Sequence, residues 1–283
     1  MKRILLFLML VTTLLVDPAI AADIASDVRS GGGVPDTSDG GYFEIGVAAG
    51  YLANPRVNDD DDEGWEVGLS LAGGYRYKGF FVEASQGTFD GLNLGYNLWN
   101  NKHWSVDLLA SSLNGDIDTD NADRIDNRLT EAQRDKELID RDTFYSGAGI
   151  RLTGYYDDYI LQYRFVTDTH GGNGVTSTAR LGKSWQVKNW NFHGVVSAEY
   201  TSATTNRYWL GISAAEATTR FPEYDPGASV SFNAEVGVTY PLSKDWVFRS
   251  FARFGLLPDE QKNSPLADDD QWVLFLNSIS YVF

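Results

Sequence analysis

The sequence predicts an all-β fold, a transmembrane antiparallel up-and-down β-barrel of about 12 strands. Three features indicate it: an N-terminal export signal, repeated segments in which apolar and polar residues alternate, and a C-terminal strand that ends on Phe283. After the export signal, no stretch reaches 18 consecutive apolar residues, so the sequence offers no candidate transmembrane helix.

Residues 1–21 have the features of a secretory signal peptide. Lys2 and Arg3 precede a mainly apolar run of 13 residues, and Ala19-Ile20-Ala21 is a small-x-small cleavage motif. We therefore expect the mature chain to begin at Ala22, with cleavage at the neighbouring bond as the alternative.

The mature chain is predicted to have two parts. Residues 22–40 are small, polar and rich in glycine, and are interpreted as a flexible periplasmic lead, with a plug inside the lumen as the less favoured alternative. Residues 41–283 are predicted to form the outer-membrane barrel.

Composition excludes several functional classes. The net charge of −16 becomes −17 without the signal peptide, which argues against nucleic acid as a partner. The absence of cysteine excludes disulfides and thiolate chemistry. The sequence has no phosphate loop, dinucleotide fingerprint or metal-ligand spacing, so we expect no cofactor, metal site or catalytic residues.

Period-two alternation predicts each strand, because successive side chains of a strand point to opposite faces. The clearest segment alternates without a break from Ala228 to Tyr240. The predicted strands are 41–53, 64–78, 80–86, 91–99, 103–112, 143–156, 159–167, 175–187, 190–202, 228–240, 246–256 and 271–283.

Tight turns alternate with mainly longer connections along the chain. The tight turns lie at 78–79, 100–102, 157–158, 188–189 and 243–245. Outer-membrane barrels place such turns in the periplasm. Aromatic residues flank them and predict a girdle at that membrane interface: Trp99, Trp104, Trp185, Trp190, Trp246, Tyr77, Tyr155, Tyr159 and Tyr240.

The final strand carries Ile279, Tyr281 and Phe283 on its apolar face. An exposed apolar edge would aggregate, so we expect this strand to close the barrel by pairing with the first one. The ending resembles the C-terminal assembly signal of bacterial outer-membrane barrels, which implies the barrel-assembly machinery as a partner.

Charged residues occupy the polar phase of the strands, which would face the lumen if the apolar phase faces lipid. The acids are Glu44, Glu66, Glu83, Asp107, Glu199 and Glu235, and the bases are Arg76, Arg151, Arg164, Arg180, Arg249 and Arg253, with His193 among them. The acids gather on early strands and three arginines on strands six to eight. We prefer a salt-bridged network that fills the lumen; the alternative is a transverse field across a narrow pore.

Two outer loops offer candidates for other chemistry. The run from Asp59 to Glu63 is interpreted as a solvated acidic loop, loosely bridged by divalent ions to lipopolysaccharide, in preference to a Ca²⁺ site. His170 beside Asp168 is the outer-rim candidate for a surface enzyme, which we consider the least favoured function.

Two stretches near the C-terminus carry a family resemblance. Residues 207–217 (RYWLGISAAEA) and 221–228 (FPEYDPGA), with Asn263-Ser264-Pro265-Leu266, resemble a conserved loop and an S-P-L/I element of the MipA/OmpV family. The loop positions are Tyr208, Gly211, Glu216, Pro222, Tyr224 and Gly227. We expect this loop to fold over the barrel mouth as a structural lid, in preference to a binding surface.

The resemblance implies a non-catalytic barrel in the outer membrane of a Gram-negative bacterium. One family member is regarded as a scaffold that links a lytic transglycosylase to a peptidoglycan synthase. The leading hypothesis is therefore a scaffold or envelope-interaction protein, surrounded by outer-membrane lipid and lipopolysaccharide, with peptidoglycan enzymes as possible partners. A narrow channel for small solutes or ions is the alternative.

Overall fold

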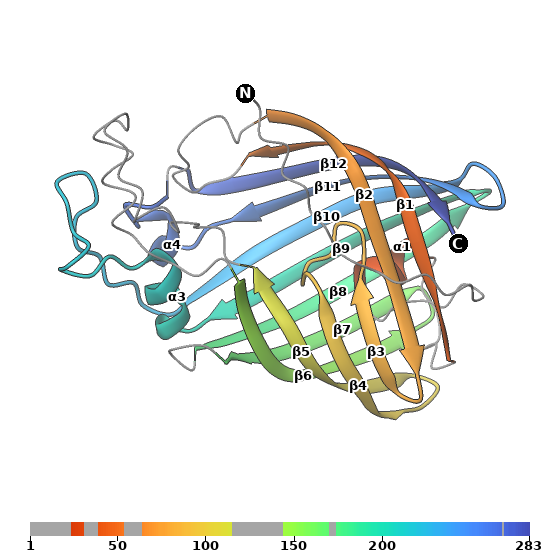
Figure 1. Cartoon of the computed structure of the whole chain (residues 1–283), viewed down its shortest axis with the longest axis horizontal. Coiled ribbons are helices and arrows are strands. Elements are labelled where there is room, and N and C mark those ends of the chain that lie inside the picture. The colour runs from red at the N-terminus through yellow and green to blue at the C-terminus, as the bar shows by residue number, and fades with distance from the viewer. Residues whose placement is uncertain (1–23, 31–38, 54–63, 115–143, 170–173, 268) are drawn as a thin grey trace.

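The computed structural model describes residues 24–30, 39–53, 64–114, 144–169, 174–267 and 269–283. The predicted signal peptide, the acidic run from Asp59 to Glu63 and His170 lie outside these residues. In the described chain, 12 antiparallel strands close into a barrel (Figure 1). This confirms the predicted fold class.

The strand bounds agree with the predicted ones to within two residues. They are β1 Gly40–Ala53, β2 Gly64–Tyr77, β3 Phe80–Ala84, β4 Asn93–Asn100, β5 Trp104–Asn114, β6 Phe144–Tyr156, β7 Tyr159–Asp168, β8 Val175–Val187, β9 Trp190–Thr201, β10 Ser229–Pro241, β11 Trp246–Leu256 and β12 Gln271–Val282.

Three helices appear in the described residues: α1 Ile24–Arg29, α3 Ala203–Leu210 and α4 Asp259–Lys262. None of these helices has the length and apolar character that a membrane span requires.

The last strand closes the barrel against the first, as expected from its apolar face. Strand β12 pairs with β1 from Glu44 opposite Val282 to Ala53 opposite Val273. The Phe283 N–H also donates to the Phe43 carbonyl at 2.8 Å. This pairing removes the free edge at which an open sheet would aggregate.

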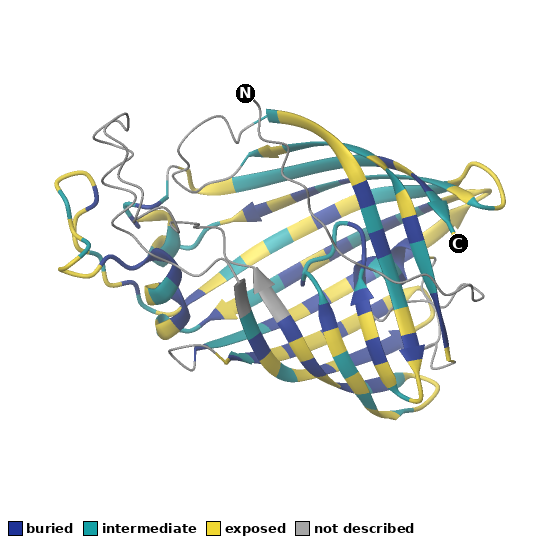
Figure 2. Cartoon of the chain, in the orientation of Figure 1, coloured by how far each residue is buried: buried dark blue, intermediate teal, exposed yellow. Residues whose placement is uncertain are grey.

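The two faces of the wall differ in polarity. Along β7, Gln162 and Arg164 are buried, whereas Leu161, Tyr163 and Phe165 are exposed. Figure 2 shows the same alternation of buried and exposed positions on neighbouring strands. Apolar side chains outside and polar ones inside are the arrangement that a lipid bilayer selects.

Most girdle aromatics face outward near the tight turns, but Tyr155 does not. Tyr155 is 5% exposed, and its hydroxyl donates to Asp27 Oδ2 inside the barrel at 2.9 Å. Its placement in the girdle was therefore wrong. Strand β6 carries Arg151 and Thr153 on the inner face, so the period of two brings Tyr155 inward and leaves Tyr156 in the interface.

Residues 24–29, expected within a flexible periplasmic lead, instead form α1 inside the barrel (Figure 1). Ile24 and Val28 are four positions apart and share one helix face, which packs against inward-facing residues of β6, β7 and β9. The Asn191 side chain donates hydrogen bonds to the carbonyls of Val28 and Arg29 at the end of the helix. For these residues, the less favoured plug interpretation describes the structure.

Deletion of Phe283 should reduce barrel assembly sharply while export continues. The deletion removes a backbone bond to β1 and an aromatic contact with Tyr281, whose ring centroid lies 4.7 Å away. Heat-modifiable migration of outer-membrane fractions measures assembly. The control is Phe232→Ala, which removes an outward-facing aromatic ring far from the C-terminus. Normal assembly of the variant that lacks Phe283 would refute the predicted assembly signal.

Candidate functional site

Most of the predicted lumen charges are buried inside the barrel. Arg249 and Glu199 are partly buried, and Glu66 is exposed near the outer end of β2. The buried members of the predicted set are Glu44, Arg76, Glu83, Asp107, Arg151, Arg164, Arg180, His193, Glu235 and Arg253.

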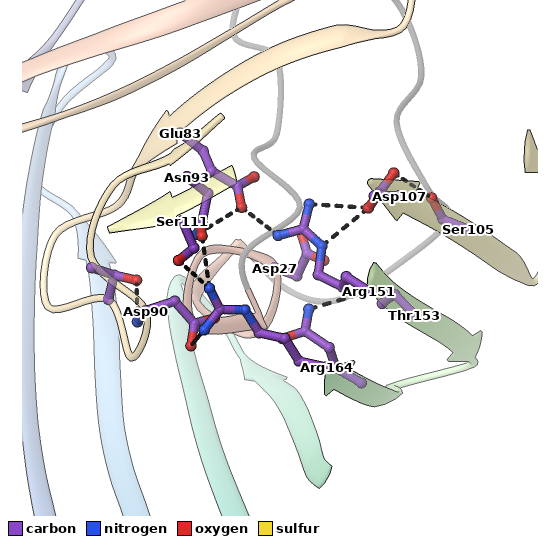
Figure 3. Close-up of polar contacts among 12 residues, drawn as sticks. Asp27, Glu83, Asp90, Asn93, Ser105, Asp107, Ser111, Arg151, Thr153 and Arg164 are labelled. Carbon is purple, nitrogen blue, oxygen red and sulfur yellow. Dashed lines mark hydrogen bonds and ion pairs between the residues drawn. The ribbon is translucent and has the colours of Figure 1, made fainter. Parts of the chain in front are cut away.

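One ion-pair hub joins β3, β5 and β6. The Arg151 guanidinium bonds to Glu83 through Nη1 and to Asp107 Oδ2 through Nε at 3.0 Å (Figure 3). Asp107 on β5 lies directly opposite Arg151 on β6, so this ion pair joins two neighbouring strands. Strand β3 supplies the second carboxylate, and the three strands are fastened together inside the wall.

A second hub lies on Asp90, a residue outside the predicted set of lumen charges. Arg164 Nη1 donates to Asp90 Oδ1 at 2.7 Å, and Arg180 donates to both carboxylate oxygens at 2.6 and 2.7 Å. The predicted strands 80–86 and 91–99 would place Asp90 in a short outer connection. In the structure, β3 ends at Ala84, and residues 85–92, hereafter the inner segment, turn into the lumen.

Glycine allows the inner segment to turn inward. Gly87 and Gly91 have φ values of 56° and 69°, in the left-handed region that residues with a Cβ avoid. A Cβ on Gly87 would come within 2.3 Å of the Phe251 ring. These two glycines are the sequence signal that could have distinguished a connection that turns into the lumen from one that extends outside the barrel.

The charge of Asp90 is fixed by its partners. Burial alone would raise the pKa of this carboxyl, but the adjacent Arg164 and Arg180 lower it well below its usual range. Both arginines favour the ionised carboxylate, and Asp90 bridges the inner segment to β7 and β8.

A third hub lies on Glu235 of β10. Arg253 donates to Glu235 Oε2 through two nitrogens at 2.9 and 2.7 Å, and His193 Nε2 lies 3.1 Å from Oε1. Arg29, at the end of α1, donates to the same carboxylate at 2.8 Å. Arg253 also stacks on Phe89 of the inner segment, with its Cζ 3.5 Å from the ring centroid.

A small polar cavity lies between α1, the inner segment and β1. Its volume is about 20 Å³, room for roughly one water molecule. Its lining includes Tyr42, Gln86 and the ion pair between Glu44 and Arg249. A cavity of this size is too small for an organic ligand.

Helix α1 and the inner segment together span the lumen. Helix α1 packs on β7, β8 and β9, and Arg29 bonds to the Gln86 carbonyl of the inner segment. On the far side, the Gln86 side chain bonds to Ser70 of β2 and Ser278 of β12. Among the described residues, protein therefore extends from one wall of the barrel to the opposite wall.

These contacts favour the ion-paired network over an open field across a pore. The acidic and basic side chains do not form two separate surfaces across the lumen. Each of five arginines contacts a carboxylate: Arg151, Arg164, Arg180, Arg249 and Arg253. Buried charges require such partners, since an unpaired one carries a desolvation cost of several kcal/mol.

The family-loop positions lie at the opposite end of the barrel from the tight turns, in an outer cap made of residues 203–227 and 258–267 (Figure 1). Its core contains Ile212, Phe221 and Leu266, with Tyr224 packed against them. Ser264 donates to the Leu210 carbonyl at 2.7 Å. The two parts of the resemblance thus meet in one small core.

Most family-loop residues make contacts within this cap. The Gly211 N–H caps α3, the Glu216 carboxylate accepts from Ser213, and Tyr208 stacks edge-on against Trp209. Tyr224 donates to the Glu260 carbonyl, the Gly227 N–H donates to the Glu260 carboxylate, and Pro222 is exposed.

The described residues contain no group of three or more metal-ligating side chains. His103 lies beside a tight turn, stacked on Tyr156, and His193 is buried in the Glu235 hub. The structure does not bring these two histidines together.

Comparison with known proteins identifies the family. A family model described as MltA-interacting protein MipA matches residues 45–283. The chain belongs to the MipA family. The MltA-interacting protein of Escherichia coli is 25% identical to this MipA-family barrel over 256 residues, which cover 86% of this chain and 91% of that relative.

A second relative is the outer membrane protein OmpV of Vibrio cholerae, which is 28% identical over 76 residues, 26% of this chain and 30% of that protein. The family, the relatives and the closed barrel place this protein in the outer membrane of a Gram-negative bacterium.

Among solved structures, the NanC porin aligns with a TM-score of 0.43 and 8% identity, over 84% of this chain and 98% of that one. A likeness at this level carries no argument.

Asp90→Asn should destabilise the barrel by about 3 to 5 kcal/mol, because it removes the buried carboxylate that Arg164 and Arg180 both contact. Urea unfolding of the refolded protein in lipid vesicles measures the loss. The matched control is Asp225→Asn, whose partner Arg207 is 55% exposed, and which should cost less than about 1 kcal/mol. Equal losses from the two variants would contradict the role assigned to Asp90.

Proposed function

We propose that this MipA-family barrel is a non-catalytic scaffold that holds a peptidoglycan-remodelling enzyme at the periplasmic face of the outer membrane. The observation that carries the proposal is the filled lumen, in which α1, the inner segment and three ion-pair hubs occupy the interior. Function is then expected on the exposed turns and loops.

A relative supports the class of partner. The Escherichia coli relative is named an MltA-interacting protein, and it aligns with most of this chain. Peptidoglycan lies in the periplasm, so a partner that acts on it can reach the tight turns but not the outer cap. We therefore assign docking to the turn end of the barrel.

Two of the tight turns carry a lysine in a costly conformation. Lys78 and Lys188 have φ values of 49° and 55°, where asparagine or glycine would be less strained, and both side chains are exposed. They place positive charge at the rim that a periplasmic partner would meet. These two lysines are our candidates for partner contact.

The narrow-channel alternative needs a route past α1 and the inner segment, and we place it second. A surface enzyme built on His170 has no support from the described residues. Recognition of Ile279, Tyr281 and Phe283 by the barrel-assembly machinery and contact with lipopolysaccharide remain proposals.

Lytic transglycosylases of the same organism, tested one by one, should include one that binds the refolded mature barrel in detergent. A double variant, Lys78→Asn with Lys188→Asn, keeps the turn conformation and removes two positive charges. It should weaken binding of the enzyme about three- to tenfold. Surface-immobilised barrel and soluble enzyme give the affinities.

Lys262→Asn in α4 removes an equivalent charge from the outer end and serves as the control. Absence of binding to every enzyme would refute the scaffold. Equal weakening by the outer control would refute docking at the turns.

A further inference from the structure

Helix α1 lies in a fitted recess of the lumen wall. Ile24 and Val28 are completely buried against Tyr155, Ile160 and Val195. The wall is hollowed where the helix lies: a Cβ on Gly182 would come within 2.6 Å of Val28 Cγ1 and 3.3 Å of Ile24 Cδ1. The recess thus depends on the absence of a side chain at Gly182.

Polar contacts complete the docking. Asn191 Nδ2 donates to the carbonyls of Val28 and Arg29 at 2.9 and 2.7 Å. The Tyr155 hydroxyl donates to Asp27 at 2.9 Å. The helix has six residues, too few to be stable alone in water, so it is helical only while these contacts hold it.

The wall keeps its charge pairing without the helix. If Arg29 leaves, Glu235 retains two bonds from Arg253 and the contact with His193. In the described part of the chain, the ion pairs of Asp90 and those that join Arg151 to Glu83 and Asp107 include no residue of α1. The helix can therefore leave without breaking the network that joins the strands.

We propose that α1 is a removable plug, and that its withdrawal opens a route for small ions along the inner face of β9. Asn191 and Val195 line the recess, Ser197 follows on the same face, and Glu199 is partly exposed further toward the outer end. The inner segment bounds the opposite side. A helix with its side chains is about 10 Å wide, which sets the scale of the vacated space.

This activity goes beyond the scaffold function and does not depend on it. A barrel with a removable plug would be silent at rest and permeable only when the helix is displaced. Enzyme binding at the turns and ion passage through the lumen can each fail while the other holds.

Two variants displace the helix from opposite sides. Ile24→Asp with Val28→Asp places charges on the docked face, and Gly182→Leu fills the recess in the wall. Each should give steady conductance steps in planar bilayers, recorded from protein that migrates as a folded, heat-modifiable barrel. Gly68→Leu is the matched control, because a Cβ there has no atom within 4 Å, and it should remain silent.

A thiol readout follows the helix itself, since the chain has no cysteine of its own. Ala25 is completely buried in α1. In an Ala25→Cys background, Gly182→Leu should raise the rate of labelling by a hydrophilic maleimide at least tenfold. An unchanged labelling rate would overturn the displacement, and faster labelling with both folded variants silent in bilayers would overturn the route.

Discussion

A charged side chain inside a barrel wall must find a counter-charge, because the loss of hydration costs more than any single neutral contact returns. This constraint organises the interior. The carboxylates of Asp90 and Glu235 each contact two arginines, and Arg151 contacts two carboxylates. Each hub joins elements that are far apart in sequence, so the ion pairs stabilise the barrel from its inner side.

The hubs also explain why the β3–β4 connection is internal. Strand β3 has only five residues, and the chain that follows it enters the lumen where Arg164, Arg180 and Arg253 converge on it. An outer loop would have left these guanidinium groups with fewer partners. The short strand and the buried arginines are therefore two parts of one arrangement.

The strands, the closure and the inward phase of the charges could be predicted because they follow from local alternation and turn residues. Asp90 and α1 could not, since their positions depend on distant groups: the arginines of β7 and β8 for Asp90, and the recess at Gly182 for α1. Local patterns gave partial signals in Gly87, Gly91 and the spacing of Ile24 and Val28.

The error at Tyr155 has a different origin. Tyr155 and Tyr156 are adjacent, so only one can face lipid, and continuing the inward phase of Arg151 and Thr153 would have selected Tyr156.

The family-loop motif has a structural explanation in the outer cap. The segment that contains Phe221 and the one that contains Leu266 lie on different connections, yet they share one core. Ser264 and Glu260 add hydrogen bonds between the same two connections. The motif residues therefore stabilise a folded cap, and the turn end of the barrel is the surface that we propose for the partner.

We infer that paired charges, α1 and the inner segment close the resting lumen. Planar-bilayer recording of the unmodified mature protein, from Ala22 to Phe283, tests it most directly, with circular dichroism of the same sample to confirm β structure. We predict a folded barrel that gives no steady current. Regular ion-selective steps from that barrel would contradict the account, because they would require an open path where the structure places protein.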